Sequence, residues 1–114
     1  MGMRITRLAD AEPFEPVGHH GVGPVRLQGG DATPTETVTV VLSHYLPGAK
    51  AEMAPQPVET VYVVTAGELV MISEGAEETL RPNDSVHFTE GTVRAVVNRS
   101  NLPASMLVIR PTGR

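Results

Sequence analysis

Residues that could carry chemistry are few and widely spaced in this sequence. Cysteine is absent, which excludes disulfides, thiolate nucleophiles and zinc-thiolate sites. Of the four histidines, His19 and His20 lie in the glycine-flanked stretch "GHHGVGP", where surface exposure is expected, while His44 and His87 stand alone. The stretch "MAPQPVETVYVVTAG" (53–67) reads as a strand that runs into a tight turn, yet it contains no histidine. The sequence therefore offers no compact metal-binding motif.

The elements that must position these residues are predicted to be short β-strands. Prolines and glycines are spread along the chain, and β-branched runs lie between them, which is typical of an all-β sandwich or barrel with little or no helix. The predicted strands are 37–46, 60–67, 68–73, 77–81, 84–88, 92–98 and 105–109. Residues 1–36 are less regular and are predicted to form a loop or edge strand that acts as a lid or a dimer arm. Residues 37–114 are predicted to form the barrel.

Composition limits the functions that this chain can have. Its 114 residues, 40% of them hydrophobic, suit one compact domain. The net charge of −4 and the lack of a basic cluster argue against nucleic acid as a partner. No segment approaches the run of about 20 apolar residues that a membrane span needs, and no signal peptide is recognisable, so we expect a cytoplasmic protein that does not enter a membrane.

The strand pattern and the glycines resemble those of the cupins, small jelly-roll barrels whose first motif is G-x5-H-x-H-x(3,4)-E-x6-G. Gly48 and Gly67 match its two glycines with the right spacing. Its three metal-ligand positions fall on Ala54, Gln56 and Thr60. Of these replacements only Gln56 keeps an acceptor oxygen, and a neutral amide is a weak ligand for a transition metal.

The second cupin motif, G-x5-P-x-G-x2-H-x3-N, matches at Gly91 and Asn98 and places Arg94 at the histidine position. A guanidinium remains protonated and has no lone pair, so Arg94 cannot replace a histidine on a metal. The resemblance therefore implies a jelly-roll barrel in which a fixed positive charge lies near the family's metal site. Such a charge favours an anionic ligand bound by bidentate hydrogen bonds.

Strand alternation predicts which side chains share the inner face with Arg94. Thr60 occupies a former ligand position, so Tyr62 is expected to face inward with it. In 37–46 the even-numbered positions are the more apolar, which predicts that His44 also faces inward. Glu59 is left as either an outward surface charge or, after a one-residue slip, an inward acid that could pair with Arg94.

These residues predict a small cupin barrel that binds an anionic molecule, a carboxylate or a phosphate, without metal or other cofactor. Arg94, Gln56, Thr60 and Glu59 are the predicted ligand-binding residues, and Tyr62 and His44 are the candidates for proton transfer of the isomerase or lyase type. One alternative is a metal enzyme whose ligands have moved to His44, Gln56, Glu59 and a loop histidine. Another is a barrel that senses its ligand without catalysis. Because a single jelly roll leaves sheet edges uncovered, we also expect a homodimer.

Overall fold

The computed structural model describes residues 2–112, which form nine strands and one short 3₁₀ turn, η1 (Leu8–Asp10). The strands are β1 (Glu12–Pro13), β2 (His19–Gln28), β3 (Val38–Pro55), β4 (Thr60–Ala66), β5 (Leu69–Ser73), β6 (Ala76–Leu80), β7 (Ser85–Phe88), β8 (Val93–Val97) and β9 (Ala104–Pro111). The predicted all-β jelly roll is confirmed. Within residues 2–112 no helix is long and apolar enough to cross a membrane.

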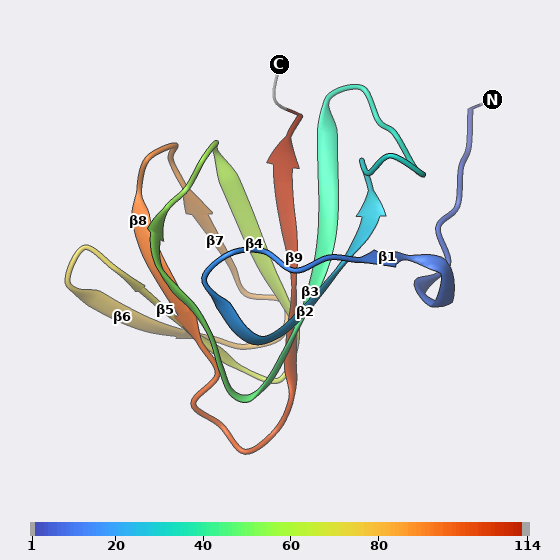
Figure 1. The fold of residues 1–114 in the computed structure, drawn as a ribbon. Helices are drawn as coiled ribbons and strands as arrows, with labels where there is room; N and C mark the ends of the chain where they lie inside the picture. The colour runs from blue at the N-terminus through green and yellow to red at the C-terminus, as the bar shows by residue number, and fades with distance from the viewer. Residues whose placement is uncertain (1, 113–114) are drawn as a thin grey trace.

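The strands curl into a nearly closed barrel in the order β6-β5-β8-β3-β9-β4-β7 (Figure 1). Strand β3 belongs to both halves of the barrel because it bends at Gly48, which has a φ of 81°. Its first part pairs with β9 between Val38 and Tyr45, and its second part pairs with β8 between Lys50 and Pro55. The bend therefore brings the end of β3 next to β8, where Arg94 lies.

One matching residue from each cupin motif, Gly48 and Asn98, lies at this bend. The amide of Gly48 donates to the carbonyl of Asn98 at 2.8 Å, and the amide of Asn98 donates to the carbonyl of Ala49 at 2.9 Å. The buried Asn98 side chain donates to the carbonyls of Tyr45 and Leu102. These motif residues thus hold the barrel together.

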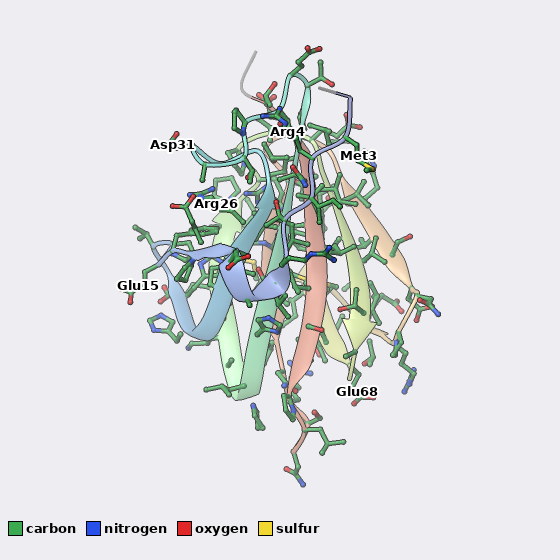
Figure 2. The ribbon with its side chains drawn as sticks, turned by 90° about the vertical axis from the view of Figure 1, so that its right-hand side faces the viewer. Met3, Arg4, Glu15, Arg26, Asp31 and Glu68 are labelled. Carbon is green, nitrogen blue, oxygen red and sulfur yellow. The ribbon has the colours of Figure 1, made fainter. Side chains whose placement is uncertain are left out.

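The N-terminal residues are more regular than expected. Strand β2 is ten residues long and pairs antiparallel with β3, from His19 opposite Ala51 to Gln28 opposite Val40. His19 and His20, which were expected in a loop, therefore begin a strand. The chain before η1, which carries Met3 and Arg4, runs along the outside of the barrel (Figure 2), and Arg4 Nη2 donates to the carbonyl of Pro34 at 2.7 Å.

The predicted inward face of β3 is wrong. Ser43 and Tyr45 are buried, whereas His44 is exposed and Leu46 is 62% exposed. The outer face of β3, β9 and β4 carries two rows of partly exposed aliphatic side chains, so apolar character does not distinguish it from the inner face. The rows are Val40, Ile109 and Val61, and Leu42, Leu107 and Val63. His44 therefore lies outside the barrel and is not placed to act on a ligand within it.

Gly67 is predicted to tolerate substitution less well than another turn glycine, Gly75. It has a φ of 67°, and a Cβ built there would lie 2.6 Å from the carbonyl oxygen of Pro103. Gly75 has a similar φ of 78° but open space around its Cβ position. We expect Gly75→Ala to cost about 1–2 kcal/mol from the left-handed backbone alone, and Gly67→Ala to cost more because the backbone of Pro103 must also move. Chemical denaturation of both variants measures this difference, and equal losses would contradict the close approach.

Candidate anion site inside the barrel

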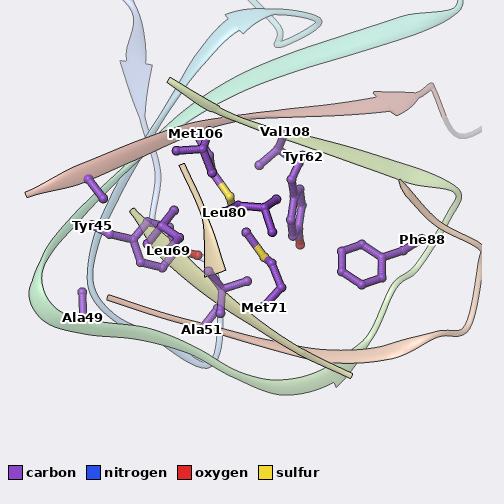
Figure 3. Packing of buried hydrophobic residues seen from close by; sticks show 13 residues of the cluster. Tyr45, Ala49, Ala51, Tyr62, Leu69, Met71, Leu80, Phe88, Met106 and Val108 are labelled. Atoms are coloured by element: carbon purple, nitrogen blue, oxygen red, sulfur yellow. The ribbon is translucent and has the colours of Figure 1, made fainter. Parts of the chain in front are cut away.

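Four of the predicted site residues meet inside the barrel. Thr60 and Tyr62 lie on β4, Gln56 directly follows β3, and Arg94 lies on β8. All four are buried, with Arg94 5% exposed and the others at 1% or less. The predicted inward orientation of Thr60, Tyr62 and Arg94 is therefore confirmed, and Figure 3 shows the Tyr62 ring among the buried apolar residues.

The hydroxyl of Tyr62 is the centre of a hydrogen-bond network. Arg94 Nε and Gln56 Nε2 each donate to Tyr62 Oη at 2.8 Å. Gln56 Oε1 accepts from Arg110 Nη2 at 2.8 Å, and Thr60 Oγ1 accepts from Arg110 Nε at 3.0 Å. The network thus links two arginines through neutral side chains.

The direction of each bond in this network follows from Arg110. A guanidinium can only donate, so the amide oxygen of Gln56 must face Arg110 and its NH₂ must face Tyr62. Tyr62 Oη then accepts two bonds, which leaves its own proton available for an acceptor. No described residue supplies that acceptor.

Arg110 was not among the predicted site residues, although the sequence contains a signal for it. On β9, Met106 and Val108 are buried, and Arg110 continues their alternation by one step. The predicted strand ended at residue 109, one residue too early to include it.

Neither arginine has an acidic partner among residues 2–112. The ion pairs of the described chain are His20–Glu52, Arg81–Glu68, His87–Glu59 and Arg99–Glu77, all with exposed side chains. Glu59 is exposed, and its carboxylate lies 2.7 Å from His87 Nε2. It therefore takes the outward position of the two that were predicted, and it neither pairs with Arg94 nor reaches the interior.

A cavity of about 80 Å³ lies beside the network, between the inner face of the barrel and the N-terminal segment. This is about three times the volume that a water molecule occupies in the liquid. Its polar lining residues are His19, Ser43, Tyr45, Tyr62, Arg94 and Arg110, and its apolar ones are Phe14, Pro16, Pro24, Val41, Met106 and Val108. Gln56 and Thr60 are not part of the lining. Their contacts instead hold Tyr62 and Arg110 in place.

The polar side chains that line this cavity can all donate hydrogen bonds. Tyr45 is 1% exposed, and its hydroxyl makes no hydrogen bond within the described residues. Burial, and to a lesser degree the neighbouring Tyr62, raise the pKa of Tyr45, so the hydroxyl keeps its proton. Apolar walls with a few convergent donors are typical of a small-molecule site, and the donors here suit a negatively charged oxygen.

Comparison with known proteins agrees with the fold. Residues 41–110 match the family model described as the cupin domain. The chain belongs to the cupin family. It is 46% identical over 106 residues to the beta-D-galactosidase Rv1717 of Mycobacterium tuberculosis, a match that covers 93% of this chain and 91% of that protein.

Solved structures are also similar to this chain. The polyketide cyclase RemF of Streptomyces resistomycificus superposes with a TM-score of 0.86 at 15% identity, over 98% of this chain and 81% of RemF. A cupin-superfamily sugar phosphate isomerase of Silicibacter pomeroyi gives a TM-score of 0.65 at 30% identity, over 75% of this chain and 57% of that one. The likeness to RemF shows the fold alone.

The residues at the cupin metal positions do not fit a metal ion. Ala54 has no ligand atom, Arg94 is a cation, and the one suitable oxygen of Gln56 already accepts from Arg110. The alternative set is not assembled either, because His44 and Glu59 are exposed while Gln56 is 1% exposed. Within residues 2–112, no three histidine, aspartate or glutamate side chains gather where they could hold a metal ion.

A larger groove of about 420 Å³ lies between β5, β6 and β7. Its acidic residues, Glu78 and Asp84, are exposed, and Asp84 accepts from the amide of Arg81 at 2.9 Å. The groove thus lacks the arginine and tyrosine side chains that line the smaller cavity. The smaller cavity is the better candidate site.

Substitution of Arg94 tests whether this residue supports the fold or a ligand. In the absence of ligand, a buried charge without a counterion is costly. We therefore expect Arg94→Met to raise the free energy of unfolding by about 1 kcal/mol, measured by chemical denaturation in a buffer without small carboxylates or phosphate. Arg99→Met, which removes a surface cation paired with Glu77 at 2.8 Å, is the control and should change little. Strong destabilisation by Arg94→Met would mean that Arg94 is a framework residue.

Proposed function

We propose that this cupin binds a small anionic molecule, with its carboxylate or phosphate group held by Arg94 and Arg110. The observation that carries the proposal is that two guanidinium groups line one cavity and lack an acidic partner among the described residues. An anionic ligand would supply the missing negative charge through charge-assisted hydrogen bonds. The remaining N–H groups of both arginines, at Arg94 Nη2 and Arg110 Nη1, make no hydrogen bond with the described residues.

The proposed ligand class is a hydroxylated acid or a phosphorylated sugar. The cavity holds only one small anionic group, so the rest of such a ligand would extend from it. Similar proteins are named for carbohydrate chemistry, namely the beta-D-galactosidase and the sugar phosphate isomerase. The tyrosine hydroxyls and Ser43 would bond to ligand hydroxyl or carbonyl oxygens, which is consistent with such a ligand.

Hydrolysis of a glycoside is less well supported by this cavity. Most glycosidases use two carboxyl groups about 5–10 Å apart, one on each side of the bond that is cleaved. No aspartate or glutamate is among the described residues that line the cavity. The named activity of the relative therefore supports a sugar-derived ligand here more than it supports the same reaction.

Proton transfer is the chemistry that the cavity donors favour. When a proton leaves a carbon next to a carbonyl group, negative charge develops on the carbonyl oxygen. Preorganised donors such as Tyr62 Oη and the Arg94 guanidinium stabilise such charge. A barrel that only senses its ligand would use the same contacts but leave the ligand unchanged after long incubation. Homodimer formation and cytoplasmic location stay predictions.

A thermal-shift titration tests the anion site. D-galacturonate, galactose 6-phosphate, malonate and inorganic phosphate are the charged probes, and neutral galactose is the control ligand. A probe that binds only the folded state at 100 times its Kd stabilises the protein by about 2.7 kcal/mol. We expect stabilisation by at least one charged probe, weak or no stabilisation by galactose, and loss of the effect in Arg94→Met and Arg110→Met.

Arg99→Met is the matched variant for this titration, because it removes an arginine from the surface and should keep the full response. The proposal fails if no charged probe stabilises the wild type, or if stabilisation survives both cavity substitutions.

A further inference from the structure

His19 differs from the other three histidines in its surroundings. His44 lies on the outer face of β3, His20 contacts the carboxylate of Glu52, and His87 contacts that of Glu59. His19 alone among the four lines the cavity that also contains Tyr62 and both arginines. It is also half-buried, unlike His20, His44 and His87, which are exposed.

The position of His19 is fixed by the strand that it begins. It lies opposite Ala51 in the β2–β3 ladder, and the carbonyl of Gly18 accepts from the amide of Glu52 at 2.8 Å. The preceding segment is held as well, since the Arg26 guanidinium lies 4.0 Å from the centre of the Phe14 ring. The paired backbone of β2 and β3 thus fixes the position of His19 beside the cavity.

The hydrogen bond of His19 selects one form of its ring. His19 Nδ1 lies 3.0 Å from the carbonyl oxygen of Val17, which can only accept, so Nδ1 must carry a proton. In the neutral ring, Nε2 then has a free lone pair, and Nε2 makes no hydrogen bond with the described residues. This is the form in which a histidine can accept a proton.

The charges around His19 keep it in that form at neutral pH. Burial lowers the pKa of His19, and the positive charges of Arg94, Arg110 and His20 lower it further, against the opposing effect of the Val17 carbonyl. Besides the two arginines, the other titratable groups that line the same cavity are Tyr45 and Tyr62, and no acidic side chain is among its described lining.

We propose that His19 Nε2 is a general base that removes a proton from a carbon next to a carbonyl or carboxyl group of the bound anion. This inference rests on the anion site proposed above and makes the protein a proton-transfer enzyme of the isomerase or epimerase class. The C–H bond breaks, its proton moves to Nε2, and its electron pair forms a C=C bond while charge moves onto the carbonyl oxygen. Tyr62 Oη and Arg94 stabilise that oxygen. The imidazolium then returns the proton to the same carbon or a neighbouring one, so no cofactor or co-reactant is consumed.

Exchange of substrate protons with solvent tests this step directly. Pyruvate, D-galacturonate and fructose 6-phosphate are first tested for a thermal shift and are then incubated with the protein in D₂O. The loss of C–H signals next to the carbonyl or carboxyl group is followed by ¹H NMR. We expect faster exchange in a probe that also gives a thermal shift. His19→Gln should lower the rate by about 100-fold or more while the thermal shift persists, and His44→Gln, the same change on the outer face, should leave both unchanged.

The pH profile separates a base from a structural residue. The wild-type rate should rise with pH as His19 loses its proton and then level off, with an apparent pKa lower than that of an ordinary histidine. The rise should be missing in His19→Gln. Long-range ¹H–¹⁵N NMR of the protein without a probe should show a neutral His19 ring protonated on Nδ1 at pH 7.

The outcomes distinguish the two proposals. If a probe stabilises the wild type but no exchange occurs, or if His19→Gln exchanges as fast as the wild type, the anion site stands and the role of His19 is wrong. A His19 ring that is charged at pH 7, or protonated on Nε2, overturns that role without any ligand. If no probe binds, the anion site fails and the role of His19 fails with it.

Discussion

The Tyr62 hydroxyl, which accepts a hydrogen bond from Arg94 and another from Gln56, is the contact on which the interior of the barrel depends. It joins β4, β8 and the end of β3 through a single oxygen atom. Its neutrality matters, because a carboxylate at this point would cancel the charge of Arg94. With phenol and amide partners, the two guanidinium groups are oriented but not neutralised, and their charge remains available to a ligand.

The scaffold supports this network with the residues that the cupin motifs retain. The bend at Gly48 and its hydrogen bonds with Asn98 set the angle between the two parts of β3. That angle brings Ala54 opposite Arg94 on β8, and Gln56 follows two residues later. These backbone contacts do not depend on metal-ligand side chains, so the barrel geometry is compatible with Ala54, Gln56, Thr60 and Arg94 at the ligand positions of the motifs.

The sequence correctly predicted the inward orientation of those residues whose positions follow from the spacing of the cupin motifs. Thr60 and Arg94 were placed by that spacing, and strand alternation then placed Tyr62 correctly from Thr60. His44 lies at no motif position, so its orientation was inferred from the apolar character of alternate residues. Because the outer face of this strand is also aliphatic, that inference was wrong. The interior, by contrast, includes the polar Ser43, which breaks the assumption that the inner face is the apolar one.

Two other residues of the cavity were missed, for different reasons. Arg110 continues the alternation of the buried Met106 and Val108, but the predicted strand stopped at residue 109, so its contacts with Gln56 and Thr60 were not foreseen. His19 belongs to a glycine-rich stretch in which apolar and polar residues do not alternate regularly. Its place at the cavity depends on pairing with β3, about thirty residues away. Long-range strand pairing of this kind has no signature in a single sequence.

A pair of guanidinium groups is a different chemical solution from a divalent metal, although both carry a charge of about +2. A metal ion binds through open coordination positions and lowers the pKa of a bound water molecule, which provides a nucleophile. Arginines offer directed hydrogen bonds in fixed planes and activate no water. The proposed site would select its ligand by the geometry of an oxyanion, and it would need a base from another residue. Among the described residues that line this cavity, His19 is the one whose neutral side chain offers a basic nitrogen lone pair, and it would connect the N-terminal strand to the proposed chemistry of the interior.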